Sequence, residues 1–279
     1  MFKFSDEALE TISDYVKEFE ETLEKFPIGV DPLYARILLS ELEDTLKFYC
    51  IKHSERKAAE RVEVTNVNYV IKKYGKPRKF LKNVKEHRNR QRIALESLKL
   101  IEETLGKSKR PKVLDAGCGW GRYLKRLQTS HIKNIEMIGI DIDSLSLSYG
   151  KTLNRQVDFT KSDVQALPFN DQIFDLVLCN AVIHEIKTSL GREQLIQEFS
   201  RILKPQGMLY ISDAFSKFPI LSVASKILQN LTPKIEWHFP KNALEKILLR
   251  NSLKIVSEEK ISLNFREGTV SFVVIAIKG

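Results

Sequence analysis

The hydrophobic pattern changes its period near residue 110, and this change divides the chain. In the first segment, apolar residues recur every three or four positions, which is typical of an amphipathic helix: Leu9, Ile12, Val16, Phe19 and Leu23. After Pro111, short apolar runs alternate with helical stretches, a pattern that predicts a parallel sheet with right-handed crossovers. We therefore expect an all-α domain over residues 1–108 and an α/β domain over residues 109–279.

Turn and capping residues delimit the helices of the first domain. Pro27 is expected to end the first helix, and Asp31 followed by Pro32 supplies an N-cap and a first helical residue for the second. The third and fourth helices are predicted at about residues 55–75 and 78–106, each ending at a glycine.

The last two predicted strands, 253–263 and 269–278, differ from the earlier ones. The link between them, residues 264–268, is too short to hold a crossover helix. The two strands must therefore form an antiparallel hairpin at the edge of the sheet.

Residues 112–123, KVLDAGCGWGRY, end a buried strand, turn on three alternate glycines and begin a helix. Glycine accepts positive φ and lets the backbone approach a ligand closely, and helix N-terminal amides follow at once. Dinucleotide enzymes place glycines at G-x-G-x-x-G, whereas this chain has G-x-G-x-G at Gly117, Gly119 and Gly121. Asp115 would repel a pyrophosphate but suits an ammonium group, so we expect a nucleoside with an amino-acid tail.

Acidic residues follow the next predicted strands. Asp141 comes about 20 residues after Gly121, where α/β nucleotide sites hold ribose hydroxyls. Asp163 follows the third strand. Either carboxylate alone could simply cap a helix, but successive strand ends of one open sheet meet where ligands collect.

The ordered blocks of the second domain resemble the class I S-adenosylmethionine-dependent methyltransferases, over roughly residues 110–279. Residues 161–169 look like the adenine segment of that family, and residues 174–181 look like its fourth strand and ligand-facing tip. Residues 198–211 look like the helix, Pro-Gly turn and fifth strand of the branch that includes quinone-biosynthesis methyltransferases. The resemblance implies a Rossmann-like, seven-stranded α/β sheet that ends in an antiparallel hairpin.

The resemblance also implies S-adenosylmethionine as cofactor and a set of residues that hold it. Asp163 would accept a hydrogen bond from the adenine amino group, and Val164 would donate one from its backbone amide. The implied cofactor-binding residues are Asp115, Ala116, Gly117, Cys118, Gly119, Gly121, Tyr123, Asp141, Ile142, Asp163, Val164, Asn180 and Ala181.

Two histidines are the candidate catalytic residues. An oxygen or nitrogen acceptor can need its proton removed near the transition state, a task that suits histidine. His184 follows the fourth strand and His238 follows the fifth. Each could instead cap a helix or pack against aromatic side chains.

The absence of motifs for base methylation and for metal binding narrows the class of methyl acceptor. Residues 179–182 lack the Pro-Pro-aromatic tip with which amino-group base methylases clamp a flipped base, and Cys179, which no proline precedes, is expected to pack in its strand. No His, Cys and carboxylate cluster has metal-ligand spacing, so no metal is expected. The apolar insertion 214–228 would serve as a lid or as an ordinary packed helix. These features favour a small organic acceptor.

The net charge of +9 is unevenly distributed. Residues 72–92 are strongly basic, whereas the first helix is acidic, so the two could pair, or the basic segment could track RNA phosphates. The alternative function is therefore an RNA methyltransferase that uses this basic segment. Only Tyr74 and Phe80 could stack on bases there, which weakens that alternative. Two further alternatives are a nonenzymatic cofactor-binding assembly module and a homo-oligomer formed through the N-terminal helices.

Compartment signals favour the cytoplasm. No apolar run approaches the ~20 residues that span a bilayer, so no integral membrane segment is expected. Residues 1–7 lack the basic start and apolar core of a secretory signal, and three widely spaced cysteines suit a reducing compartment.

Overall fold

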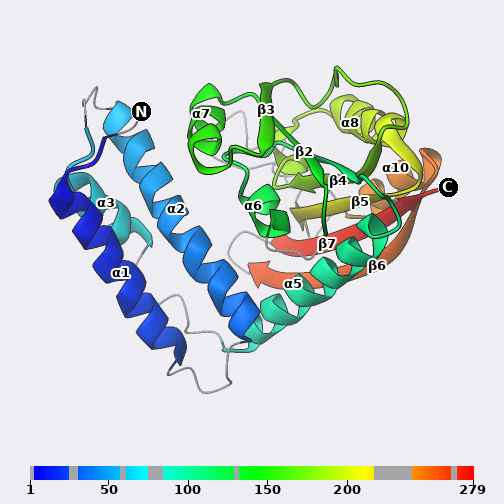
Figure 1. Ribbon diagram of the computed structural model, residues 1–279. Helices are drawn as coiled ribbons and strands as arrows, with labels where there is room; N and C mark the ends of the chain where they lie inside the picture. Colours follow the sequence, from blue (N-terminus) through cyan, green and yellow to red (C-terminus); the bar gives the residue numbers. More distant parts are fainter. Residues whose placement is uncertain are drawn as a thin grey trace, which may run out of the picture. The chain divides into compact units, whose positions relative to one another are not determined.

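The computed structural model describes residues 3–24, 31–56, 61–74, 84–128, 132–216, 241–264 and 269–279 (Figure 1). The chain divides into two compact units, Met1–Glu96 and Ser97–Gly279. The division falls within helix α5 (Val84–Leu105), so the last turns of this helix belong to the sheet unit.

The described part of the first unit contains α1 (Asp6–Glu24), α2 (Pro32–Arg56), α3 (Val64–Tyr74) and the first turns of α5. Phe19 and Leu23 of α1 pack against apolar residues of α2. The predicted N-cap of α2 is confirmed, because Asp31 Oδ1 accepts hydrogen bonds from the amides of Leu33 and Tyr34 at 2.9 and 3.1 Å.

Two expectations about these helices are wrong in detail. The third helix does not start after Ser54, because α2 continues to Arg56 and Ser54 Oγ bonds the carbonyl of Arg61 instead. The buried face of α1 is also rotated from the predicted one: Ala8 and Tyr15 are buried, whereas Leu9 is 41% exposed. Tyrosine and alanine extend the apolar face, and the sequence pattern had not counted them.

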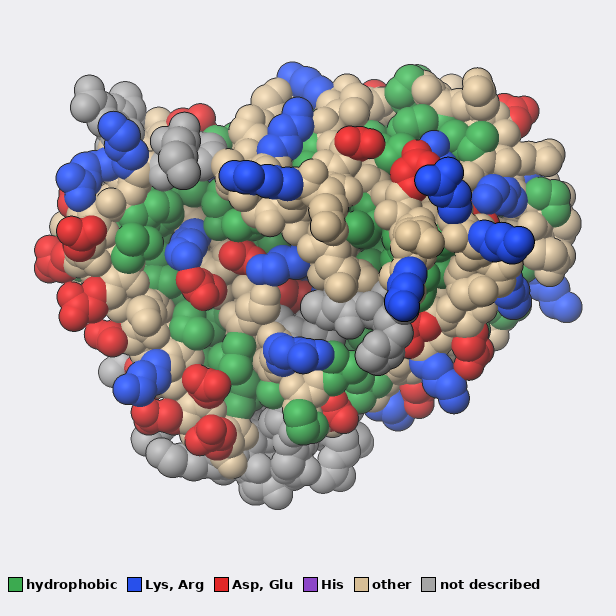
Figure 2. All heavy atoms as spheres, in the orientation of Figure 1, with side chains coloured by type: hydrophobic (Ala, Val, Ile, Leu, Met, Phe, Trp, Pro, Cys, Tyr) green, Lys and Arg blue, Asp and Glu red, His purple; other side chains and the backbone are tan. Residues whose placement is uncertain are grey.

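Acidic side chains gather along the outer face of α1, at the left of Figure 2. The exposed members are Asp6, Glu7, Glu10, Asp14, Glu18, Glu20, Glu21 and Glu24. Residues 75–83 of the basic segment expected to oppose them lie outside the described residues, and the side chains of residues 73–90 are not described.

The second unit contains a seven-stranded sheet in the order β3-β2-β1-β4-β5-β7-β6. Its strands are β1 (Lys112–Ala116), β2 (Glu136–Asp141), β3 (Val157–Lys161), β4 (Phe174–Asn180), β5 (Leu203–Ser216), β6 (Leu253–Asn264) and β7 (Thr269–Lys278). Strands β1 to β5 pair in parallel, and β7 pairs antiparallel with both β5 and β6. The predicted α/β fold with a C-terminal edge hairpin is confirmed.

Helices cover both faces of this sheet. One face packs against α8 (Ser189–Ile202) and α10 (Lys241–Arg250) through a continuous core that includes Leu114, Ile140, Cys179 and Phe199. Helices α6 (Arg122–Gln128) and α7 (Ser144–Leu153) contribute no residue to that core, and Gly150 of α7 instead packs on Phe159 of β3. The buried position of Cys179 confirms its expected packing role, and burial raises the pKa of its thiol.

Among the described residues, no helix is long and apolar enough to span a bilayer. No group of three or more His, Cys, Asp or Glu side chains within the described ranges is arranged to hold a metal ion.

The turn before the main part of β5 contains a residue with a strained backbone conformation, and the strain should be measurable. Gln206 has φ of 63°, a conformation that costs a residue with a Cβ roughly 1 kcal/mol and costs glycine little. We expect Gln206→Gly to be more stable than Gln206→Ala by about 1 kcal/mol in denaturant unfolding. The alanine variant controls for loss of the side chain. Equal stability of the two variants would contradict the strain.

Candidate cofactor and acceptor site

The glycine loop at the end of β1 is held open by backbone bonds to the neighbouring strand. Gly117, Gly119 and Gly121 all have positive φ, at 76°, 55° and 81°. The amides of Gly117 and Cys118 donate to the carbonyl of Ile140 at 2.8 and 2.9 Å. Because β1 and β2 run in parallel, the loop therefore lies beside the tip of β2.

The three glycines do different work. A Cβ on Gly117 would come within 2.3 Å of Val182 Cγ2, and one on Gly121 within 2.7 Å of Phe159 Cζ. These two positions need glycine because other parts of the chain pack directly on them. A Cβ on Gly119 would meet no described atom within 4 Å. Gly119 therefore offers the open backbone that a ligand can approach.

Asp115 is a buried carboxylate with no partner in the described structure. It lies at the end of β1, is 1% exposed, and neither side-chain oxygen has a hydrogen-bond partner among the described residues. Burial, reinforced by the charge of Asp141 and opposed by Arg122, raises the pKa of Asp115 to about 7. An unpaired carboxylate next to a glycine loop suits the ammonium group of an amino-acid tail.

Asp141 fixes the loop to the tip of β2. Its Oδ2 accepts from the amide of Gly119 at 2.8 Å, and its Oδ1 accepts from the amide of Asp143 at 2.8 Å. Each carboxylate oxygen keeps capacity for a further hydrogen bond, as holding a ribose hydroxyl requires. Ile142, directly beside it, is 69% exposed and could pack on an adenine ring.

The tip of β4 meets the start of α6. Tyr123 donates its hydroxyl hydrogen to Asn180 Oδ1 at 2.8 Å. Ala181 adopts φ of 55° and donates its amide to the carbonyl of Ser212 in β5. The predicted residues Asn180, Ala181 and Tyr123 therefore come together, although the sequence spacing of Tyr123 and Asn180 is wide.

The expected adenine segment follows β3. Asp163 is exposed, and its Oδ1 accepts from the amide of Gln165 at 2.9 Å, so the carboxylate also shapes its own turn. Val164 is half-buried against the core below α8. Their backbone and side-chain atoms can hold an adenine edge from this turn.

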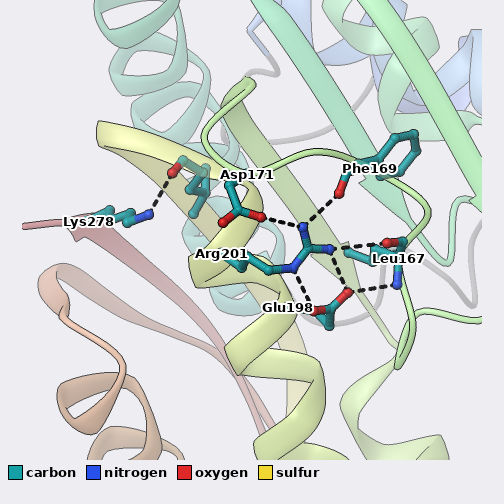
Figure 3. A network of polar contacts seen from close by, with 7 residues as sticks. Leu167, Phe169, Asp171, Glu198, Arg201 and Lys278 are labelled. Atoms are coloured by element: carbon teal, nitrogen blue, oxygen red, sulfur yellow. Dashed lines mark hydrogen bonds and ion pairs between the residues drawn. The ribbon is translucent and has the colours of Figure 1, made fainter.

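A polar network that the sequence did not predict anchors this segment to α8 (Figure 3). Arg201 donates to the carbonyls of Leu167 and Phe169 at 3.1 and 2.6 Å, and to Asp171. Glu198 accepts from Arg201 and from the amide of Leu167. The hydrogen bonds that Arg201 donates to Glu198 lower the pKa of Glu198 and raise the pKa of Arg201, so both groups stay charged.

Two predicted cofactor-binding residues have side chains that are packed away from the site, and one predicted catalytic residue lies outside the described structure. The side chain of Ala116 is in the core, and the sulfur of Cys118 lies against Gly139, so both can reach a ligand only through their backbone. Burial also raises the pKa of Cys118 above its usual value. His238, the second catalytic candidate, lies outside the described residues, as does most of the insertion 214–228.

His184 lies in a 3₁₀ turn, η1 (Ile183–Glu185), directly after β4. Its Nδ1 is 2.7 Å from Oδ1 of Asp213, a β5 residue whose side chain is 1% exposed. Sequence analysis missed Asp213 as well. The signal was present, since Asp213, like Asp141, is an isolated carboxylate at the end of an apolar strand.

Comparison with known proteins assigns this unit to a class. Residues 114–211 match the family described as a methyltransferase domain. The solved structure of a SAM-dependent methyltransferase from Methanosarcina mazei has a TM-score of 0.52 and 24% identity, and covers 64% of this chain and 96% of that one. This likeness shows the fold.

Two curated relatives extend the comparison. The ubiquinone/menaquinone biosynthesis C-methyltransferase UbiE of Campylobacter jejuni is 29% identical over 164 residues, which are 56% of this chain and 68% of the relative. The mouse protein named "Probable tRNA methyltransferase 9B" is 34% identical over 99 residues, 36% of this chain and 21% of the relative. This chain thus spans only about a fifth of the mouse protein.

The fold, the glycine loop and the matching domain together define the class. Residues 114–211 match a methyltransferase domain, and the sheet that contains them has the fold of a SAM-dependent methyltransferase. The described residues fit S-adenosylmethionine, because Gly119 leaves open backbone in the loop that follows Asp115, and the buried carboxylate of Asp115 has no described partner.

The different surroundings of the loop glycines predict different effects of alanine. Gly119→Ala should weaken S-adenosylmethionine binding at least tenfold with a loss of unfolding free energy near 1 kcal/mol, because its Cβ enters open space at positive φ. Gly117→Ala should destabilise the protein more, because its Cβ meets Val182. Calorimetric titration and thermal unfolding measure both. Unchanged cofactor affinity in Gly119→Ala would contradict this assignment.

The raised pKa of Asp115 predicts how pH acts on stability and binding. A folded pKa of about 7, against about 3.9 unfolded, means that the cofactor-free protein loses stability as pH rises from about 4 to about 7, by roughly 4 kcal/mol. Asp115→Asn should therefore unfold at a higher temperature than the wild type at about pH 8.

Cofactor binding should respond in the opposite direction. Only ionised Asp115 attracts an ammonium group, so wild-type affinity should rise between about pH 5.5 and about pH 7, where an α-amino group stays protonated. Asp115→Asn should bind more weakly and lose this dependence. An identical pH profile in both proteins would show that Asp115 does not face the cofactor.

Proposed function

We propose that this protein is an S-adenosylmethionine-dependent methyltransferase that acts on a small organic acceptor in the cytoplasm. The buried, unpaired Asp115 carboxylate, in the strand that leads into the loop with the open Gly119 backbone, is the observation that supports cofactor use. The acceptor class is supported by the match to a quinone C-methyltransferase, which runs over 56% of the chain. The absence of base-clamping residues at 179–182 agrees with that class.

Each part of the site has a task in this reaction. S-adenosylmethionine, when bound, supplies a methyl group already activated by its sulfonium. Asp115 attracts the amino-acid tail, Asp141 holds the ribose, and Asp163 with Val164 meets the adenine. Most of the rate then comes from placing the acceptor in line, which is a matter of proximity. His184, past the tip of β4, takes the proton of an acceptor that must lose one.

RNA is the second candidate acceptor. The specific observation in its favour is the 34% identity, over 99 residues, to the mouse protein named "Probable tRNA methyltransferase 9B". The net charge of +9 adds general attraction to phosphates. Charge of this kind gives salt-sensitive binding to any RNA and does not by itself identify a substrate.

Methyl transfer into fractionated cell extract separates the two acceptors. With labelled cofactor, we expect label in the small-molecule fraction and little in total RNA. A variant with Arg88, Arg90 and Arg92 changed to Glu should keep this activity, and Asp141→Ala should lose it. Label in one RNA species, abolished by the triple variant at near-physiological salt, would instead establish the RNA acceptor.

A further inference from the structure

Asp213 is buried, so the loss of its hydrogen bonds would leave an uncompensated charge inside the protein. Its Oδ1 lies 2.7 Å from His184 Nδ1, and its Oδ2 accepts from the amide of Ile183 at 2.7 Å. The amide of His184 also points at Oδ2, at 3.4 Å. One buried carboxylate thus holds both the backbone of the η1 turn and the ring of its histidine.

These contacts determine the tautomer of the imidazole. Ionised Asp213 can only accept hydrogen bonds, so Nδ1 of His184 must carry the hydrogen. In the neutral ring, Nε2 then holds the lone pair and is the basic nitrogen. Nε2 lies 3.3 Å from Oε1 of Glu185, whose side chain is 77% exposed.

The charged groups around His184 come from three elements. Asp213 reaches it from β5, Glu185 belongs to the same turn, and Arg192 approaches from α8. Arg192 is 6% exposed, and its Nε donates to the carbonyl of Ile183 at 3.4 Å. Burial lowers the pKa of Arg192, and the charge of Asp213 opposes this shift, so the guanidinium compensates the buried carboxylate.

The turn that carries His184 adjoins the cofactor loop. Val182, two residues earlier, packs so closely on Gly117 that a Cβ there would lie 2.3 Å from Val182 Cγ2. The cofactor loop and the η1 turn are therefore fixed against each other. A base on this turn works at a defined place relative to the loop.

We infer that Asp213 is a positioning residue that holds His184 with Nε2 as proton acceptor, and that the acceptor is a molecule whose nucleophilic oxygen or nitrogen bears a proton. This inference rests on the proposed function. In the step, the acceptor X–H bond gives its proton to Nε2 and its electron pair to the methyl carbon. The carbon–sulfur bond breaks, its electron pair stays on sulfur, and S-adenosylhomocysteine leaves.

Nuclear magnetic resonance of protein with ¹⁵N-labelled histidine tests the tautomer without a known acceptor. The chain has five histidines, and His184→Gln assigns the relevant signal. We expect the Nδ1–H form of neutral His184 in the wild type. Asp213→Asn should keep this tautomer but move the titration of His184 downward by roughly one to three pH units, because a buried opposite charge is lost.

Glu185→Gln is the matched control, because it removes a carboxylate that is also near His184 but exposed. Its shift should be clearly smaller than that of Asp213→Asn. An Nε2–H tautomer in the wild type would overturn the inference, and this result does not depend on whether Asp213→Asn folds. If Asp213→Asn does fold, an unchanged titration of His184 would also overturn it. Calorimetry with S-adenosylmethionine on the same samples distinguishes a failure of this inference from a failure of the proposed function. If the cofactor does not bind, the proposed function itself is overturned.

The acceptor class has its own chemical readout. Methyl groups transferred to hydroxyl or N–H acceptors are stable in mild base, whereas a methyl ester of a carboxylate, which has no proton to lose at neutral pH, releases methanol. We expect labelled product from cell extract to survive mild base. Release of the label as methanol would overturn the assignment of His184 as the proton acceptor.

Discussion

The hydrogen bond from the amide of Gly119 to Asp141 is the interaction on which the rest of the site depends. It ties the positive-φ loop after β1 to the tip of β2, and the Ile140 carbonyl adds two further backbone bonds. The loop is thereby shaped by neighbouring strands before any ligand arrives. A cofactor would meet a preorganised backbone, which lowers the entropy lost on binding.

Two buried carboxylates, Asp213 and Asp115, carry a desolvation cost in this arrangement, and they differ in the contacts that compensate it. Asp213 is compensated by His184, backbone amides and the nearby Arg192. Asp115 has no such partners among the described residues, and the pKa of its carboxyl rises accordingly. A buried charge that the fold leaves unsatisfied is a candidate for satisfaction by a ligand. On this account the two buried carboxylates differ in their proposed roles: Asp213 positions a base, and Asp115 binds a cationic group of the cofactor.

Sequence predicted the sheet, its edge hairpin and the residues at strand ends, because apolar runs and glycine spacing report directly on parallel strands and their loops. It could not predict Asp213 and His184 as a pair, or Arg201 with Leu167 and Phe169, since these contacts join segments about 30 residues apart through side-chain geometry. Helix limits near Ser54 also escaped prediction, because an unbroken helical pattern does not show where the chain turns.

The central claim is that the loop from Gly117 to Gly121 holds a nucleoside with a cationic amino-acid tail, and one calorimetric comparison tests it most directly. The protein is titrated with S-adenosylmethionine, S-adenosylhomocysteine and a nicotinamide dinucleotide. The proposed contacts are to ribose, adenine and tail but not to the methyl group, so the first two should bind with comparable affinity and the dinucleotide should neither bind nor compete. Tight dinucleotide binding, or no binding of the two sulfur nucleosides, would contradict the account.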